Sequence, residues 1–325
     1  MVDNEENMSE IWGLFGRTYP TRLYRLVVGL AILYMVVCWY NRTLTGGEGY
    51  SNNDPAFVIK RDQDIYDSFY ASIYDTLYEP QADAKVIADF ILSFTQANPR
   101  NNLFLDVGCG TGEQMAYLTQ RGFMVYGLDP SEDMVATALE RHPKLAIKVG
   151  SVLTPMAYDP ATFSHILCTG TRNPLYTCKD KRTFFDHCYR WLIPNGYLVV
   201  QLVDPAKFDP VPPAAKSALP PSVSTKKEGK PRVTHAEIQF NDFQYRSSYT
   251  FGSGDTREVV VKETFTSNTS GQGTKVRQNE ERLYMEPVDK ILAIARKSGF
   301  IVHGQTNLEA RGDEHQYIYL LERPN

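Results

Sequence analysis

The order of hydrophobic and polar positions divides the chain into segments of different kinds. Residues 65–78, IYDSFYASIYDTLY, repeat an apolar residue and a tyrosine every four positions, which is typical of an amphipathic helix. Pro80 predicts the end of this helix or the start of a second one, which we expect over 81–95. An α-helix has 3.6 residues per turn, so positions four residues apart are rotated by about 40° around the helix axis. The apolar residues and the tyrosines therefore form two neighbouring columns on a wide, slowly winding face.

From residue 103 the pattern changes to short apolar runs separated by amphipathic stretches. The runs are LFLDV, MVYGLD, LAIKV, SHILCT and GYLVVQLV, and helical patterns lie between them, for example at 112–121 and 131–141. A last helix over 287–297 is followed by two strand-like runs, FIVHGQTNL and HQYIYLLER. Strands that alternate with helices predict an α/β fold with a doubly wound, mostly parallel sheet and helices on both faces.

A different pattern interrupts this alternation after residue 204. Residues 204–232 hold seven prolines and the run STKKEGK, which predicts a mobile loop, lid or linker. Alternating runs separated by Gly-rich turns follow, and they predict an antiparallel meander of about three strands. We therefore expect an antiparallel β insertion at 205–285, within a core formed by 61–204 and 286–325.

The N-terminal region carries the longest apolar run. Residues 26–40, LVVGLAILYMVVCWY, contain no charge, and Arg25 can snorkel to extend the span. Aromatic residues lie at both ends, as in an interfacial belt. We predict an N-terminal transmembrane helix over 23–41, after a tail at 1–22 and before a tether at 42–60. A cleaved signal peptide and a buried core helix are the alternatives.

Composition narrows the function classes. The 325 residues are 42% hydrophobic and 22% charged, which is typical of a globular protein. With a formal net charge of −4, the chain lacks the basic excess of a phosphate-backbone binder, so we expect no nucleic-acid partner. The five cysteines form no C-x-x-C pair, and no His/Asp/Glu cluster predicts a metal site.

The candidate chemistry lies in LFLDVGCGTG. A strand ends at Asp106, and three glycines follow at alternate positions, which allows a tight turn and the close approach of a ligand to the backbone: Gly108, Gly110 and Gly112. Asp129 closes the next strand and can accept hydrogen bonds from two ribose hydroxyls. The spacing is not the G-x-G-x-x-G of a dinucleotide site. Asp106 would suit the ammonium and sulfonium groups of S-adenosylmethionine better than a pyrophosphate.

This segment resembles the first motif of the class I S-adenosylmethionine-dependent methyltransferases almost letter for letter. The resemblance covers roughly residues 65–204 and implies a Rossmann-like fold with S-adenosyl-L-methionine as cofactor. Ser151 stands where the family often has an acid, and Asn195 replaces a glycine of the turn before the fifth strand. The resemblance implies cofactor contacts from Asp106, Gly108, Cys109, Gly110, Gly112, Asp129, Pro130, Met134, Ser151, Val152 and Thr169.

The acceptor is expected beyond the carboxyl ends of the strands. There, residues 173–176, NPLY, resemble the Asn-Pro-Pro-Tyr signature of amino-group methyltransferases, with Leu175 in place of a proline. Similar methyltransferases often carry a Tyr-x-x-x-Tyr-Asp-like segment over the cofactor, which makes Tyr66, Tyr70 and Tyr74 candidates to close the site. The catalytic candidates are Tyr70, Tyr74, Arg172 and His187.

Two functions remain open. One is an active methyltransferase that acts on a small-molecule or lipid-like acceptor by in-line displacement. The other is an inactive methyltransferase-fold scaffold tethered to a membrane. The resemblance also implies that the β insertion covers substrate or forms a homodimer.

The side of the membrane is undecided. Three arginines before the apolar run favour a cytoplasmic N-terminus, whereas a cofactor made in the cytosol favours a cytosolic main domain. We expect a single-pass anchor, with the catalytic domain on the side that has access to cytosolic S-adenosylmethionine.

Overall fold

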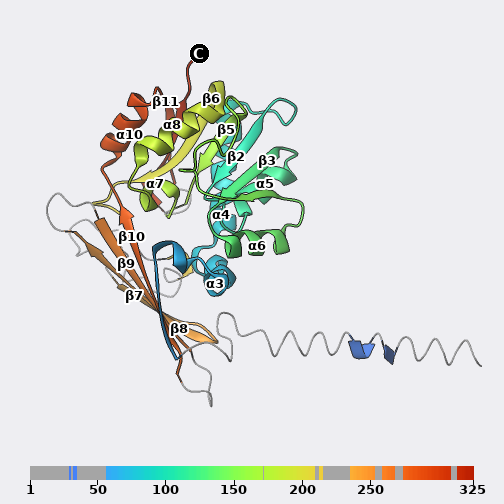
Figure 1. Cartoon of the computed structure of the whole chain (residues 1–325), viewed down its shortest axis with the longest axis vertical. Helices are drawn as coiled ribbons and strands as arrows, with labels where there is room; N and C mark the ends of the chain where they lie inside the picture. Colours follow the sequence, from blue (N-terminus) through green and yellow to red (C-terminus); the bar gives the residue numbers. More distant parts are fainter. Residues whose placement is uncertain are drawn as a thin grey trace, which may run out of the picture. The chain divides into compact units, whose positions relative to one another are not determined.

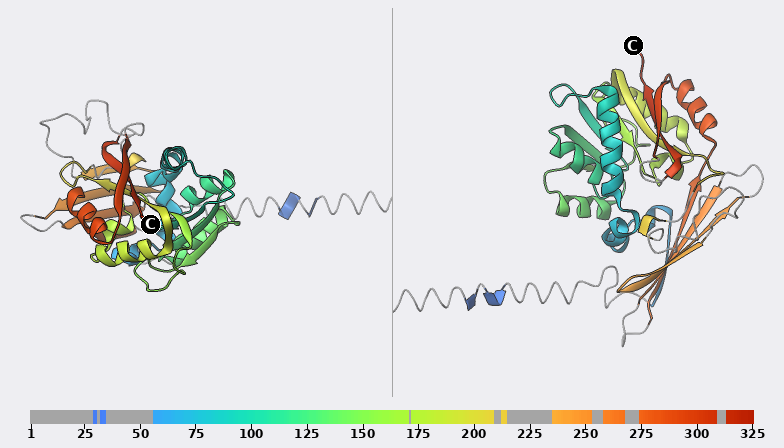
Figure 2. Two further views of the ribbon diagram at one scale, coloured as in Figure 1. Left: turned by 90° about the horizontal axis from the view of Figure 1, so that it is seen from above. Right: turned by 180° about the vertical axis from the view of Figure 1, so that it is seen from behind.

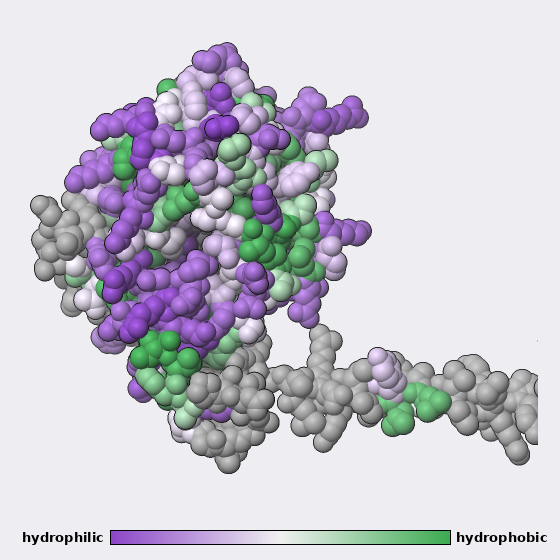
Figure 3. Space-filling view, viewed as in Figure 1, coloured by the Kyte–Doolittle hydropathy of each residue, from purple (hydrophilic) through white to green (hydrophobic). Residues whose placement is uncertain are grey.

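The computed structural model divides the chain into two compact units, 1–47 and 48–325. It describes residues 29–30, 32–34, 56–170, 172–208, 212–214, 235–252, 258–267, 274–308 and 313–325. The described residues of the first unit are helical, and Leu30, Ile32 and Leu33 are exposed (Figure 3). Among the described residues, no helix has the length and apolar character needed to cross a membrane. Most of the predicted span, 23–41, lies outside them.

A seven-stranded sheet organises the second unit (Figure 1), with the order β11-β12-β6-β5-β2-β3-β4. Its parallel strands are β2 (Leu103–Val107), β3 (Met124–Asp129), β4 (Ala146–Val149), β5 (Phe163–Cys168) and β6 (Leu192–Val203). The strands β11 (Ile301–Leu308) and β12 (Asp313–Glu322) form an antiparallel pair beside β6. The predicted mostly parallel α/β sheet is confirmed.

Helices cover both faces of this sheet (Figures 1 and 2). Because strand side chains alternate between faces, Phe104 packs with α4 (Pro80–Thr95) and α5 (Glu113–Gln120). Its neighbour Leu105 belongs to the opposite cluster, with α8 (Lys181–Trp191) and α10 (Val288–Lys297). The remaining helices of the core are α6 (Glu132–Arg141) and the single turn α7 (Pro174–Thr177), which the sequence pattern did not predict.

The insertion forms a second sheet, with the order β1-β10-β9-β8-β7. Its strands are β1 (Phe57–Arg61), β7 (His235–Gln239), β8 (Phe243–Phe251), β9 (Glu258–Ser267) and β10 (Val276–Tyr284). The insertion contributes four strands, one more than expected, because the turn at 241–242 divides the first predicted run in two. The fifth strand, β1, pairs in parallel with β10 and comes from residues assigned to the tether.

Helix α3 (Ser68–Tyr78) joins the two sheets and contains the tyrosine repeat. A short 3₁₀ turn, η1 (Asp62–Ile65), precedes it, and the Asp67 side chain caps it by accepting a hydrogen bond from the Tyr70 N–H. The apolar column of the helix, including Ile73 and Leu77, packs against residues of the insertion sheet such as Phe265. The predicted amphipathic helix is confirmed, with its start at Ser68.

Candidate active site

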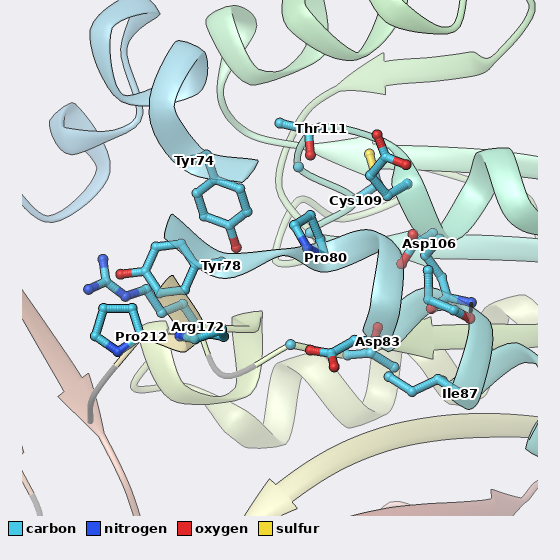
Figure 4. Close-up of a pocket in the computed structure, with 18 of the residues that line it drawn as sticks. Tyr74, Tyr78, Pro80, Asp83, Ile87, Asp106, Cys109, Thr111, Arg172 and Pro212 are labelled. Carbon is cyan, nitrogen blue, oxygen red and sulfur yellow. Dashed lines mark hydrogen bonds between the residues drawn. The ribbon is translucent and has the colours of Figure 1, made fainter. Parts of the chain in front are cut away.

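Two cavities share a wall at the glycine-rich loop between β2 and α5. The smaller has a volume of about 130 Å³ and the larger about 680 Å³. Tyr74, Gly108, Gly110 and Arg172 line both of them. Figure 4 shows the smaller cavity, with Arg172 beside Tyr78 at one side and Asp106 of β2 at the other. A ligand that lies along this wall can therefore reach both cavities.

The glycines of the loop have different roles. Gly108 has φ +73°, and a β-carbon there would lie 2.7 Å from Cδ of Pro174. A side chain at this position would therefore both strain the backbone and clash with α7. Gly112 lines neither cavity, and a β-carbon there would lie 2.8 Å from Cδ1 of Leu145. Gly112 thus allows close packing, whereas Gly108 and Gly110 form part of the site.

Asp129 is held in place by backbone donors. Its two carboxylate oxygens accept hydrogen bonds from the N–H groups of Gly110 and Ser131, each at 2.9 Å. Each oxygen keeps a second lone pair, which is what recognition of two ribose hydroxyls requires. Burial raises the pKa of Asp129, and the two backbone hydrogen bonds oppose that rise.

Asp106 lies at the end of β2 and has no comparable support. Its side chain is buried, and no hydrogen-bond partner for its carboxylate occurs in the described part of the chain. Burial, and then the charge of Asp129, raise the pKa of Asp106 to about 7. A buried carboxylate without a partner favours a cationic ligand, and the ammonium and sulfonium groups of S-adenosylmethionine fit this requirement.

The predicted adenine side lies in the larger cavity, which Pro130, Met134, Ser151 and Val152 line. The Ser151 hydroxyl oxygen accepts a hydrogen bond from the Leu153 N–H at 3.1 Å, so its own proton is available for a ligand. Cys109 and Thr169 line the smaller cavity. Apart from Gly112, the structure brings all the predicted cofactor residues together around the two cavities.

Two residues predicted near the acceptor, His187 and Asn173, form hydrogen bonds within the protein and line neither cavity. His187 lines neither cavity, and its Nδ1 lies 2.8 Å from the Val152 carbonyl oxygen. The Asn173 amide donates to the carbonyls of Gly170 and Gln201, and its oxygen accepts from the Leu175 N–H. Asn173 therefore caps α7, and its amide donors are not directed at an acceptor, which does not support the amino-group signature.

The tyrosine hydroxyls face a buried ion cluster that sequence reasoning missed. We call Arg172, Glu263 and Glu281 the Arg172 cluster; their side chains are 5%, 1% and 3% exposed. Tyr70 and Tyr78 donate to Glu263, and Tyr66 donates to Glu281 at 2.7 Å. The two glutamates come from β9 and β10, and only their inward position in each strand's alternation could have indicated them.

Tyr74 differs from the other three tyrosines. Its hydroxyl has no hydrogen-bond partner in the described ranges, and its ring lines both cavities, the smaller of which Figure 4 shows. The repeat thus has two parts. Tyr66, Tyr70 and Tyr78 fix α3 to the insertion sheet, whereas Tyr74 presents a free phenol to the site.

Helix α3 is also tied to the cofactor loops. Asp75 accepts a hydrogen bond from the Thr111 hydroxyl at 2.7 Å and contacts Arg141 of α6. The Ser131 hydroxyl donates to the Tyr66 carbonyl. The helix that carries Tyr74 is therefore connected to the loops after both β2 and β3.

Comparisons with known proteins agree with this geometry. Residues 105–200 match a family model described as a methyltransferase domain. The chain is 30% identical over 106 residues to an 18S rRNA (guanine-N(7))-methyltransferase of Bos taurus, which covers 30% of this chain and 38% of that protein. It is 33% identical over 93 residues to a dTDP-3-amino-3,4,6-trideoxy-alpha-D-glucopyranose N,N-dimethyltransferase of Streptomyces venezuelae, covering 27% and 38%.

A solved structure extends the likeness to most of the fold. It is an S-adenosylmethionine-dependent methyltransferase from Clostridium acetobutylicum, with a TM-score of 0.58 and 14% identity, covering 79% of this chain and 98% of that one. The sequence matches span well under two thirds of the two curated relatives. The matched region contains the glycine loop and Asp129, whereas the insertion strands lie outside it.

Proposed function

We propose that this chain, which carries a class I S-adenosylmethionine-dependent methyltransferase domain, transfers a methyl group to a small-molecule acceptor. The observation that carries the proposal is the pair Asp106 and Asp129, which end neighbouring strands on either side of the glycine loop. One carboxylate is oriented by backbone donors for ribose, and the other is buried without a partner. A scaffold that binds nothing would have no need to bury a carboxyl group without a partner there.

The bound cofactor supplies an activated methyl group on a sulfonium, whose leaving group is a neutral thioether. The protein's part is to bind and orient. Asp129 would hold the ribose, Asp106 would face the ammonium, and Met134 and Val152 would pack against the adenine. Gly108 and Gly110 let the backbone approach the ligand closely. Holding donor and acceptor in line then supplies most of the rate enhancement.

The acceptor would approach from the wall that the two cavities share. Tyr74 presents its free hydroxyl there, and Phe208, Tyr249 and Leu283 add an apolar surface to the smaller cavity. The aminosugar methyltransferase among the relatives supports a small polar acceptor, and the apolar lining is also compatible with a lipid-like one. An inactive scaffold is the alternative function.

Calorimetric titration of the full chain with S-adenosylmethionine and S-adenosylhomocysteine tests the cofactor site. We expect micromolar binding of both, and a loss of affinity of at least about tenfold in Asp129→Ala, because hydrogen bonds to a charged group are worth roughly 1.5–3 kcal/mol. Asp133→Ala, which removes an exposed carboxylate of α6, is the matched control. Absence of binding by the unaltered chain would favour the scaffold.

We further propose that residues 23–41 anchor the protein to a membrane. The support is the uncharged run at 26–40 and the exposure of Leu30 and Leu33, each 57%, in the described part of that segment. We also propose that the insertion sheet forms a homodimer. Analytical ultracentrifugation of the purified chain tests this.

A further inference from the structure

Glu281 is a buried charge at the candidate site with only one of its two carboxylate oxygens hydrogen-bonded. It projects from β10 into the larger cavity, and its side chain is 3% exposed. One carboxylate oxygen accepts the Tyr66 hydroxyl hydrogen bond at 2.7 Å. The other, Oε2, has no hydrogen-bond partner and lies 3.2 Å from Nη1 of Arg172 as an ion pair. A buried carboxylate oxygen without a donor is costly unless a ligand supplies one.

The contrast with Glu263 is direct. Glu263 accepts hydrogen bonds from Tyr70, Tyr78 and Tyr245, and Nη2 of Arg172 donates to it at 2.9 Å. Burial alone would raise the pKa of Glu263, but Arg172 and these hydrogen bonds hold it below its ordinary value. For Glu281 burial prevails over the charge of Arg172, and its pKa is raised. Arg172 therefore compensates Glu263 and leaves Glu281 only partly compensated.

The Arg172 cluster has one positive charge fewer than it has carboxylates. Two buried carboxylates share one guanidinium, and within the described ranges no other cation forms an ion pair with either glutamate. A third partner with positive charge would balance the cluster. An ammonium group satisfies both needs of Glu281, because it brings a charge and an N–H donor to Oε2.

The position of Glu281 connects this deficit to methyl transfer. It lines the same cavity as Gly110, Asp129 and Met134 on the cofactor side. Tyr74, whose phenol is free, lines that cavity as well. An ammonium bound at Glu281 would therefore enter the cavity in which the cofactor is proposed to lie.

We propose that the acceptor is an amine, that it binds as its ammonium ion to Glu281, and that Glu281 removes one proton from it before transfer. This inference rests on the proposed function. The proton passes from nitrogen to the carboxylate, which frees the nitrogen lone pair. That pair forms the new N–C bond with the methyl carbon, while the C–S bond breaks and its electron pair stays on sulfur. The products are a methylated ammonium, a neutral thioether and protonated Glu281.

Paired probes that differ in one atom test the assignment. The full chain, saturated with S-adenosylhomocysteine, is titrated with 1-aminohexane and 1-hexanol, and with glucosamine and glucose. We expect at least one amine to bind at least tenfold more tightly than its alcohol partner, and that preference to disappear in Glu281→Gln. Failure of both amines to outbind their alcohols would overturn the proposal, as would an undiminished preference in Glu281→Gln.

A pH profile separates a base from a structural residue. With S-adenosylmethionine and the better-bound amine, product measured by mass spectrometry should fall about 100-fold or more in Glu281→Gln at pH 7 and recover toward pH 10. There the amine loses its proton to solvent. The other titratable and charged groups facing Glu281 are Asp62, Tyr66, Tyr74, Arg172, Tyr249 and Glu263. Equal loss at both pH values would assign Glu281 to structure only.

Two controls keep this result distinct from failure of the methyltransferase proposal. Glu280→Gln alters the neighbouring residue, whose side chain pairs with Lys262 instead of the Arg172 cluster, and it should leave transfer unchanged. Glu281→Asp keeps the carboxylate and should retain part of the activity. Binding of S-adenosylmethionine should stay within about twofold in Glu281→Gln. If the unaltered chain did not bind it, the proposed function would fail first.

Discussion

Asp106 shows how one buried charge couples cofactor binding to stability. Its pKa of about 7 in the folded protein lies above the ordinary value of 3.8, so the folded state keeps this proton to a higher pH than the unfolded chain. Its contribution to the stability of the ligand-free protein is therefore greatest below about pH 4 and is lost as the pH rises to about 7. A bound cation would offset that loss.

Replacing Asp106 with Asn should remove this pH dependence. Because Asn cannot ionise, the free energy of unfolding of Asp106→Asn should exceed that of the unaltered protein by roughly 2–4 kcal/mol at pH 8 and much less at pH 4. Denaturant titrations at both pH values measure the difference, and the same variant should bind S-adenosylmethionine more weakly. A difference independent of pH would show that the carboxylate is not protonated by burial.

Two tyrosines of the repeat provide a matched pair. Tyr70→Phe removes a hydroxyl that donates to Glu263 and accepts from Arg172, so it should cost about 1–3 kcal/mol of unfolding free energy. Tyr74→Phe removes a hydroxyl without a protein partner among the described residues, and stability should change by less than about 0.5 kcal/mol. Only Tyr74→Phe should lower methyl transfer with stability intact. If Tyr74→Phe instead lowered stability and left methyl transfer unchanged, Tyr74 would have only a packing role.

At the scale of elements, α3 acts as a cover whose position depends on a few polar contacts. Asp75 connects it to Thr111 in the glycine loop and to Arg141 in α6. Its other face is held by apolar packing against the insertion sheet. The contacts of Asp75 therefore affect how α3 meets the cofactor loop more than whether the helix forms.

Asp75→Ala should loosen this cover. We expect faster amide hydrogen exchange over 68–78 and a five- to tenfold weaker affinity for S-adenosylmethionine, with a loss of about 1–2 kcal/mol in global stability, because a part-buried charged contact is removed. Ser72→Ala is the control, since its hydroxyl is exposed and bonds only within the helix. If affinity is unchanged in Asp75→Ala, α3 does not contribute to the cofactor site.

The elements also show what the sequence pattern could predict. Strands β2 to β6 and their helices follow from local periodicity, and the cofactor loop follows from a contiguous motif with Asp129 one strand later. β1 was missed because its partner, β10, lies more than 200 residues away. The Arg172 cluster was missed for a similar reason, since Arg172 follows β5 and meets Glu263 and Glu281, on the paired strands β9 and β10, only in the folded chain.

At the scale of the whole molecule, the site combines a shared domain with a part specific to this chain. The family match ends at residue 200, yet Glu263 and Glu281 from the insertion sheet lie against the tyrosine helix. The matched domain thus contains most of the predicted cofactor residues, and under our proposal the insertion contributes the acceptor site. The proposed division would account for motifs that predict the cofactor but not the acceptor.

Removal of residues 1–47 tests whether the N-terminal unit contributes to chemistry or to location. Those residues form a compact unit of their own. Because both cavities are lined by 62–316, the shortened chain should keep its affinity for S-adenosylmethionine and its turnover of a soluble amine within about twofold.

If the apolar run is an anchor, the same deletion should move the protein from the membrane pellet to the supernatant and reduce methylation of an amine presented in phosphatidylcholine vesicles. Replacing Leu30 and Leu33 with Arg in the full chain should have the same effect, since a charge inside a membrane helix costs about 2.5–3.5 kcal/mol on insertion scales. Membrane association that survives both changes would assign binding to another surface, and loss of turnover on soluble amines would make the N-terminal unit part of the enzyme.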